Sequence, residues 1–524
     1  MSALVLIVPG SGPNYPDTQQ KAEELYSEMI SRTQSDRIIA LREDSTSETP
    51  PGLREFAAKM GTPIQTHTIE RIDPSSFTGQ EDPEYLWADH LSTIISRLGL
   101  GINESDTNFV IGPGSGWNSS LLLSLQGVIG GKIWVSRRDW NGETHLSEIE
   151  TEILEEPALS TIAASGRISL TVGDQPFTSE QLQGLVEGMP ANQGVENTFR
   201  PYPELISRHD EPGDDATFFQ LTPLGRVRSM LALAQKWEPT KVKSGRKGLI
   251  LAARDSDGAK RAIEAVDYLK EHFSALKFDA FMVVINKYGS TDQELSQSSE
   301  AVNQKLADFL KPGSLVSTTS SFVNGDQDTF SSHYELLSLI HRTREENDDI
   351  EWSLEVSRFL APLRSAAMLY ANHANLESFC LMKNPSITEN GVFPSHLEGS
   401  MHRLNLPTKS QIMRIRGILQ TESIHKHVFT AEMALSHPEN PGAILSSAKT
   451  NPLRMYEWNR DNLPEGHQMR WGEISPDSQK QEMNKKRNIG IERGAFRESK
   501  DEFILTPEGR VAAFVLAAQM GDSN

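Results

Sequence analysis

The chain has 524 residues, with 51 lysines and arginines against 71 aspartates and glutamates, a formal charge of -20 at pH 7, and one cysteine. Cys380 alone cannot form an intramolecular disulfide, which excludes a disulfide scaffold and fits a reducing, cytoplasmic location. The acidic charge argues against a general nucleic-acid coat, so any DNA contact needs a local basic patch. The length predicts about three or four globular domains.

The first strand-like segment is the N-terminal run MSALVLIVPGSG, which has no positive region and stops being apolar at Pro9. It is too short for a signal-peptide core and is typical of a buried strand. No stretch reaches the roughly 18 apolar residues that a membrane span needs. We therefore expect no membrane partner.

An internal repeat sets the expected organisation. Residues 218–235 read FFQLTPLGRVRSMLALAQ and residues 502–519 read EFILTPEGRVAAFVLAAQ, with nine of 18 positions identical. Upstream, residues 4–30 and 248–273 each read as a strand, a polar loop and an amphipathic helix, which is the start of a parallel α/β sheet. The repeat therefore predicts an internal duplication.

The predicted fold class is α/β, with two Rossmann-like parallel-sheet domains, each followed by a winged helix-turn-helix domain. In the second copy, residues 487–519 predict a β-hairpin with Gly494 near its turn, then a helix that begins at Pro507 and is capped by Thr506. Residues 290–348 give little signal except an expected Ser-rich loop around 314–332. The expected boundaries are 1–170 and 249–405 for the Rossmann-like domains, 171–237 and 406–524 for the winged helices (the second with an insertion), and 238–248 for the linker.

The most informative loop is GPGSGWNSS at residues 112–120, between a predicted strand and helix. Glycines let backbone N–H groups approach an anion, and the following helix N-terminus is electropositive, so the loop can hold a phosphodiester. A second loop of this kind follows the first strand and should lie at the same sheet edge. The predicted ligand residues of this half are Gly10, Ser11, Gly12, Gly114, Ser115, Gly116, Trp117 and Asn118.

The second half has different residues at the corresponding positions. Arg254 and Ser256 follow its first strand, and Ser357 and Arg358 replace the glycine-rich loop. If both halves contribute to one ligand site, the first supplies close backbone approach and the second supplies cations. The alternative is that these arginines form surface ion pairs.

A basic segment stands out near the C-terminus. Residues 480–500 contain seven basic and three acidic residues. On a winged helix such a segment is expected to contact DNA phosphates, although it could equally be a solvated face. The candidate DNA-binding residues are Lys485, Lys486, Arg487, Arg493 and Arg497.

Catalytic and metal sites have weaker signals. Arg138 with His145, and Arg460 with His467, have a spacing used for acid–base work on one helix, but glycine or proline interrupts both intervals. His425 and His427 lack a well-spaced third ligand for zinc. We assign no catalytic residue, no metal and no cofactor.

Together, PGSG at 9–12, GPGSGWNSS at 112–120 and the two LTPxGR segments resemble the CRISPR-associated Rossmann fold (CARF) sensors joined to winged helix-turn-helix domains. The resemblance implies a cyclic oligoadenylate as ligand, bound between paired CARF domains, with the glycines, serines and Asn118 of the first half at its phosphates and ribose. The duplication would make the chain an intramolecular pseudo-dimer, with a higher oligomer also open. The second half departs from the pattern because residues 354–365 contain no glycine.

The resemblance implies an antiviral signalling sensor that binds cyclic oligoadenylate and regulates double-stranded DNA binding or transcription. Two alternatives stay open: a ring nuclease that cleaves its own cyclic ligand, and an adaptor whose winged helices bind protein.

Overall fold

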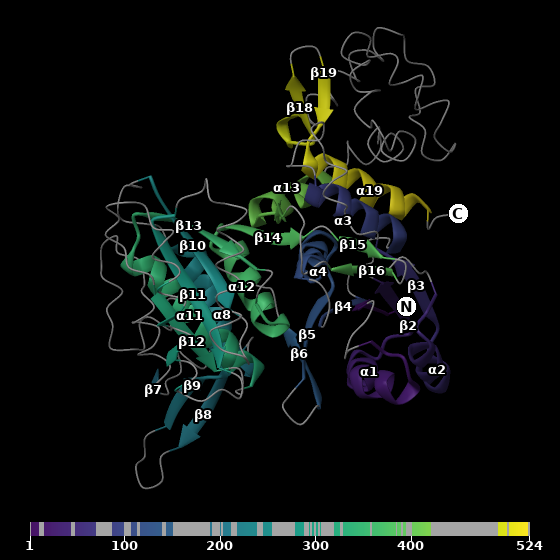
Figure 1. The fold of residues 1–524 in the computed structure, drawn as a ribbon, viewed down its shortest axis with the longest axis horizontal. Helices are drawn as coiled ribbons and strands as arrows, with labels where there is room; N and C mark the ends of the chain where they lie inside the picture. Colours follow the sequence, from purple (N-terminus) through teal and green to yellow (C-terminus); the bar gives the residue numbers. More distant parts are fainter. Residues whose placement is uncertain are drawn as a thin grey trace. The chain divides into compact units, whose positions relative to one another are not determined.

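The computed structural model divides into two compact units, residues 1–133 with 383–524 and residues 134–382 (Figure 1). Both the N-terminal and the C-terminal parts of the sequence therefore contribute to the first unit. The structure describes residues 2–9, 15–42, 48–69, 86–98, 106–112, 116–138, 143–149, 189–190, 200, 203–210, 217–237, 245–253, 278–287, 319–324, 328–356, 359–383, 385–388, 391–394, 401–420, 491–499 and 502–521, with a few isolated positions from 293 to 304.

The first sheet has six strands in the order β3-β2-β1-β4-β5-β6. They are β1 (Ala3–Val8), β2 (Arg37–Arg42), β3 (Ile64–Thr68), β4 (Thr107–Ile111), β5 (Lys132–Arg138) and β6 (Thr144–Ile149). Strand β1 pairs in parallel with both β2 and β4, and all six of its residues are buried. A continuous apolar run such as ALVLIV is what a central strand of a two-sided parallel sheet requires.

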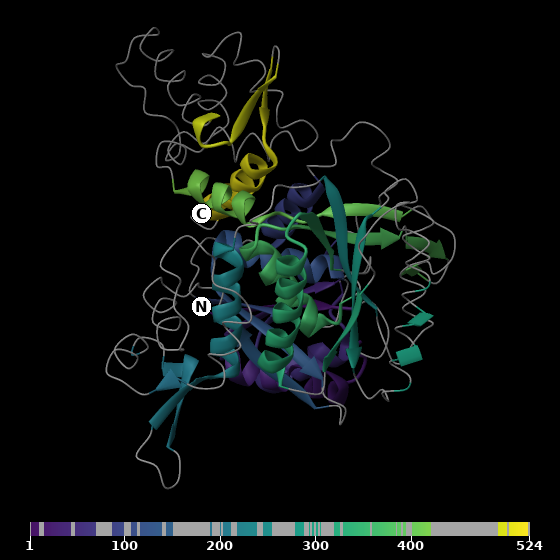
Figure 2. The same ribbon diagram turned by 90° about the vertical axis from the view of Figure 1, so that its left-hand side faces the viewer.

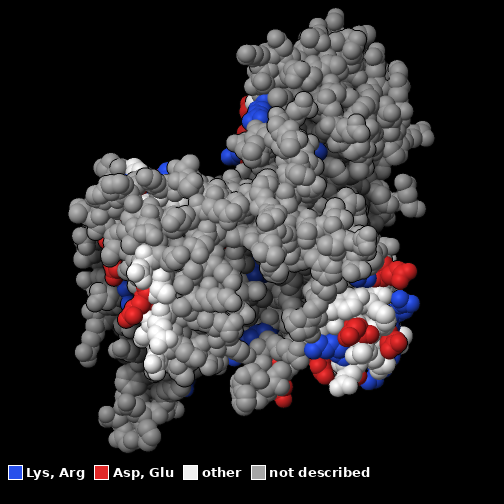
Figure 3. All heavy atoms as spheres, viewed as in Figure 1, with Lys and Arg blue, Asp and Glu red and all other residues white. Residues whose placement is uncertain are grey.

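Four helices belong to this part of the chain: α1 (Gln19–Thr33), α2 (Pro51–Met60), α3 (Leu86–Leu98) and α4 (Gly116–Ile129). Helix α1 is N-capped by Thr18 and buries one apolar face, whereas its outer face pairs charges, as in Arg32 with Glu28 at 3.4 Å. Lys59 of α2 lies 2.9 Å from Glu23 of α1. The surface of these two helices accordingly mixes both signs of charge (Figure 3).

The second sheet has the order β12-β11-β10-β13-β14-β17. Its strands are β10 (Arg246–Ala253), β11 (Ala280–Lys287), β12 (Thr319–Asn324), β13 (Ile350–Glu355), β14 (Glu377–Lys383) and β17 (Met401–Asn405). Numbered in chain order within each sheet, both sheets read 3-2-1-4-5-6, the order of doubly wound nucleotide-binding folds. Helices α11 (Thr329–Glu346) and α12 (Ala361–His373) flank β13 in sequence, and β15 (Pro385–Thr388) pairs with β16 (Gly391–Pro394). The α/β class is confirmed, with parallel pairing among β1, β2, β3 and β4 in the first sheet and among β10 to β14 in the second.

The Ser-rich loop expected around 314–332 is corrected by two elements of this sheet. Strand β12 pairs in parallel with β11 from Thr319 onward. Helix α11 begins at Thr329 because the Asp328 carboxylate accepts hydrogen bonds from the N–H groups of Phe330 and Ser331. Strand β12 is rich in serine and threonine, so its sequence resembles a loop although it pairs with β11.

Each LTPxGR segment follows a short antiparallel hairpin and begins a helix. In the first copy β8 (Ile206–Asp210) and β9 (Thr217–Leu221) precede α8 (Pro223–Lys236), with β7 (Met189–Pro190) beside β9 and the 3-10 turn η4 (Pro203–Leu205) before β8. In the second copy β18 (Phe496–Ser499) and β19 (Glu502–Leu505) precede α19 (Pro507–Gly521), with α13 (Lys409–Leu419) earlier in the chain. The expected hairpin and the helix start at Pro507 are both confirmed.

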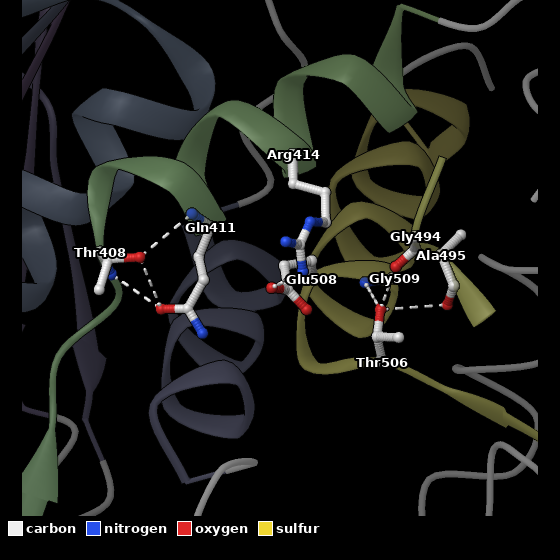
Figure 4. Close-up of polar contacts among 8 residues, drawn as sticks. All are labelled: Thr408, Gln411, Arg414, Gly494, Ala495, Thr506, Glu508 and Gly509. Atoms are coloured by element: carbon white, nitrogen blue, oxygen red, sulfur yellow. Dashed lines mark hydrogen bonds and ion pairs between the residues drawn. The ribbon is translucent and has the colours of Figure 1, made fainter. Parts of the chain in front are cut away.

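The helix starts of this C-terminal part are fixed by side-chain caps (Figure 4). Thr506 Oγ1 accepts from the Gly509 N–H at 3.0 Å, as predicted, and Thr408 forms a capping box with Gln411 at the start of α13. Arg414 of α13 lies 3.0 Å from Glu508 of α19. The prediction that Gly494 lies near the hairpin turn is wrong. Gly494, with a φ of 78°, precedes β18, and the two strands of the hairpin are joined between Ser499 and Glu502.

Two histidines are buried on equivalent helices. His90 lies on α3 and His333 on α11, and each helix connects the third and fourth strands of its sheet. Burial lowers the pKa of His90 to about 3 and that of His333 to about 4. The Pro362 backbone and the Asp328 charge oppose the shift at His333 without overcoming it. Both rings are therefore neutral in the folded protein at pH 7.

We expect acid to destabilise the fold through His333. Because its folded pKa lies below the unfolded value of about 6.5, the unfolded chain takes up the proton first, and stability falls as pH drops from about 6.5 to about 4. The loss should be about 3 kcal/mol at pH 4. In urea unfolding, the free energy of unfolding of His333→Leu should fall from pH 7 to pH 4 by about 3 kcal/mol less than that of the native chain.

The exposed His145 on β6 offers the control variant, His145→Gln. It removes a histidine without changing a buried site, and it should keep the native dependence. An unchanged pH dependence in His333→Leu would contradict the assignment.

Candidate ligand-binding edges of the two sheets

The first sheet reverses its strand order between β1 and β4. These strands are adjacent and parallel, with Leu6 opposite Val110, so both end at the same edge. From that edge the chain continues from β1 toward β2 on one side and from β4 toward β5 on the other. Open α/β sheets bind ligands at such a switch point, outside the carboxyl ends of the strands.

The two predicted glycine-rich loops begin at this switch point. β1 ends at Val8 and β4 ends at Ile111, so the chain enters both loops from neighbouring strand ends. Gly10, Ser11, Gly12, Gly114 and Ser115 themselves lie outside the described residues, while Gly116 is the first residue of α4 and Trp117 the second. The described strand ends are thus consistent with one ligand edge.

The first turn of α4 buries three consecutive polar residues. Asn118, Ser119 and Ser120 are each 5% exposed or less. Ser119 Oγ has no hydrogen-bond partner among the described residues, and an unsatisfied buried hydroxyl costs about 1–3 kcal/mol. A ligand atom at this turn would remove that cost, which adds Ser119 to the predicted Asn118 as a candidate contact.

The second sheet has the same switch point between β10 and β13. Ile250 lies opposite Leu354, and the two strands end at Ala253 and Glu355. The predicted Arg254 follows β10 directly, and Ser256, Ser357 and Arg358 also lie outside the described residues. The cationic positions of this half therefore follow β10 and β13, which hold the places in the second sheet that β1 and β4 hold in the first.

One arginine to which no sequence signal was assigned binds the backbone of the residues just before and just after Ser357 and Arg358. Arg364, in the first turn of α12, is 2% exposed and donates from Nε to the Val356 carbonyl at 3.3 Å and from Nη2 to the Phe359 carbonyl at 2.9 Å. The two acceptor residues flank Ser357 and Arg358 in the sequence. A cation in the first turn of a helix opposes the helix dipole, and this unusual placement is the sequence signal by which Arg364 could have been found.

The candidate DNA-binding residues are described only in part. Arg493 and Arg497 are exposed, the first in the turn before β18 and the second on β18, where it faces Ile504 across the hairpin. Basic side chains are visible at this hairpin in Figure 3. Lys485, Lys486 and Arg487 lie outside the described residues.

The interval between Arg138 and His145 is not helical throughout. Arg138 ends β5 and His145 lies in β6, so the two residues do not share a helix. Within the described ranges no group of three histidines, cysteines or carboxylates could hold a metal ion. His425, His427, Arg460 and His467 lie outside those ranges. Among the helices that the structure describes, none is long and apolar enough to cross a membrane.

No protein-family model matches the chain, and no curated protein matches its sequence. The solved structures to which the chain is similar include a type III CRISPR defence DNA nuclease activated by cyclic oligoadenylate, with 9% identity, a TM-score of 0.34, and coverage of 96% of this chain and 85% of that chain.

Two further structures are also similar at 9% identity. Enterococcus italicus Csm6 bound to cyclic hexa-2'-fluoro-hexa-dAMP has a TM-score of 0.25 and covers 50% of this chain and 73% of that one. Can2 from Sulfobacillus thermosulfidooxidans in complex with cyclic tetra-adenylate has a TM-score of 0.18 and covers 53% and 65%.

Proposed function

We propose that the chain is a cyclic-oligoadenylate sensor that regulates DNA binding or transcription through its hairpin–helix elements. The observation that carries the proposal is the strand order of the first sheet. It brings the starts of the loops with Gly10–Gly12 and Gly114–Gly116 to one switch point, beside the N-terminus of α4. Such a place favours an anionic, nucleotide-like ligand.

The chemistry of the loops fits the parts of a cyclic oligoadenylate. Backbone N–H groups of a glycine-rich turn and a helix N-terminus can hold phosphodiester oxygens without a countercharge. Ser11, Ser115 and Asn118 add hydroxyl and amide groups for ribose or adenine. Ser119 adds a buried hydroxyl in the first turn of α4 that has no partner among the described residues.

The second half would hold the ligand by charge. Arg254 and Arg358 follow β10 and β13, the strands that correspond to β1 and β4, and guanidinium groups pair well with phosphate oxygens. Ser256 and Ser357 would add neutral donors. The proposed recognition is therefore unequal, with close backbone approach in one half and cations in the other.

The same comparison of the two sheets supports an internal duplication and an intramolecular pseudo-dimer. Both sheets share one strand order, and both LTPxGR segments follow an antiparallel hairpin. We assign the winged-helix character to these hairpin–helix elements, with the domain boundaries given by the sequence. The exposed Arg493 and Arg497, with Lys485, Lys486 and Arg487, would then contact DNA phosphates.

Binding of cyclic tetra- and hexa-adenylate, measured by titration calorimetry with linear oligoadenylates as controls, tests the site. The double variant Gly114→Val/Ser115→Ala should weaken binding of the preferred ring about 100-fold, because two or three hydrogen bonds of about 1 kcal/mol each are lost. Met60→Ala, at an exposed residue that ends α2, should bind as the native chain does. Native affinity in the double variant would place the ligand elsewhere.

A further inference from the structure

The helix that ends each half of the sequence packs against the other half. We define the first half as residues 1–237 and the second as residues 245–524. Helix α19 of the second half lies along α3 of the first, side by side in Figure 1. Helix α8 of the first half lies along α11 and α12 of the second, as the teal and green helices of Figure 2 show.

The contact partners hold equivalent positions. Helix α3 connects the third and fourth strands of the first sheet, and α11 connects the third and fourth strands of the second. Their partners α19 and α8 are the two LTPxGR helices. The packing is therefore reciprocal, since each repeated helix covers the same helix of the opposite sheet.

Helix α13 of the second half extends this contact in the first unit. It packs on α4, and a Cβ added at Gly127 would lie 3.1 Å from Ile412 Cγ2. Ile412 is 6% exposed, so this contact is well buried. Gly127 lets the two helices approach closely, which a larger residue would prevent without a shift of Ile412.

In the second unit, Trp237 at the end of α8 contacts two side chains of α11. The guanidinium of Arg344 lies 4.6 Å from the ring centre of Trp237, and His341 meets the same ring edge to face at 5.8 Å. Tyr370 of α12 bonds both partners, with its hydroxyl 2.7 Å from His341 Nδ1 and 3.1 Å from Arg344 Nη1. Trp237 thus enters a polar and aromatic cluster built by the second half.

We infer that the two halves are interlocked by a reciprocal exchange, in which the repeated helix of each half completes the helical layer of the other half's sheet. Each of the helices α8 and α19 packs on the opposite half of the same polypeptide. The inference rests on intramolecular packing, so it holds or fails independently of the proposed ligand.

A disulfide across the first contact tests the exchange. A protease site is placed within residues 238–244 of the full chain, and Gly127→Cys is combined with Ile412→Cys. A Cβ at Gly127 lies within 4 Å of three side-chain carbons of Ile412, and this closeness is the basis for expecting a disulfide between cysteines at the two positions. After cleavage, a non-reducing denaturing gel should show the two fragments joined at the mass of the full chain, and reduction should separate them.

The matched control combines Gly127→Cys with Met413→Cys, because Met413 follows Ile412 on the same helix but is 54% exposed. This pair should leave the fragments separate, and so should each single cysteine variant. Separate fragments from an oxidised, folded Gly127→Cys/Ile412→Cys chain would overturn the exchange.

A second measurement needs no cross-link. Trp237→Ala in the full chain should speed amide hydrogen exchange in α11 and α12, which contact this end of the first half, and leave α3 unchanged. Faster exchange in α3 with α11 and α12 unaffected would show that α8 packs on its own half, and would overturn the inference.

Discussion

Replacing Gly509 by alanine is expected to lower the free energy of unfolding by about 3 kcal/mol or more. A Cβ at this position would lie 2.1 Å from the carbonyl oxygen of Ala495, which is backbone and cannot turn aside. The same carbonyl accepts the Thr506 N–H at 3.0 Å, so moving it away would also break the bond that joins the hairpin to the helix start. The substitution therefore acts on both elements.

The first copy should respond in the same way. A Cβ at Gly225 would lie 2.1 Å from the Leu205 carbonyl oxygen, and that oxygen accepts the Thr222 N–H at 2.9 Å. Gly225→Ala should thus cost a similar amount of free energy. Equal effects at both glycines would show that the repeated Gly serves one repeated packing contact.

Gly417→Ala is the matched control, since Gly417 lies in α13 with open space around its Cβ position. It should stabilise the protein by up to about 1 kcal/mol, because alanine favours a helix interior. Urea unfolding measures all three variants. Destabilisation by less than 1 kcal/mol at Gly509 and Gly225 would contradict the close backbone approach.

Replacing Arg364 by methionine is expected to lower the free energy of unfolding by about 2–4 kcal/mol. The variant leaves the carbonyls of the buried residues Val356 and Phe359 without their guanidinium donor. Because these two residues flank Ser357 and Arg358 in the sequence, affinity for the cyclic ligand should also fall at temperatures where the variant is fully folded. The first effect follows from the structure, and the second from the proposed function.

Arg342→Met serves as the control, because Arg342 is an exposed arginine of α11. It should change stability by no more than about 0.5 kcal/mol. Native stability in Arg364→Met would show that the fold does not depend on the two hydrogen bonds from the guanidinium. Reduced stability with native ligand affinity would keep Arg364 as a structural residue and remove Ser357 and Arg358 from the ligand site.

Local signals made the repeated helices and several strands predictable. Thr506 before Pro507 marks a helix cap, and the cap forms as expected. The run ALVLIV marks a central strand, and β1 is fully buried. These features depend on neighbouring residues, so the sequence alone contains the information that specifies them.

Other features depend on residues far apart in the sequence. The contact between Gly127 and Ile412 joins positions that no local pattern relates, so the reciprocal packing could not be inferred from the repeat. Strand β12 gains its pairing from β11, which a Ser-rich segment does not reveal. Arg364 donates to backbone carbonyls, so the sequence offers only the unusual place of a cation in the first turn of a helix and does not identify the acceptors.

A thermal-shift panel of cyclic tri-, tetra- and hexa-adenylate on the unmodified chain, with linear oligoadenylates beside them, tests the sensor assignment most directly. A ligand present at 100 times its dissociation constant adds about 2.7 kcal/mol to the folded state. We predict a selective rise in Tm with one ring and none with its linear form. No shift with any ring would contradict the proposed function.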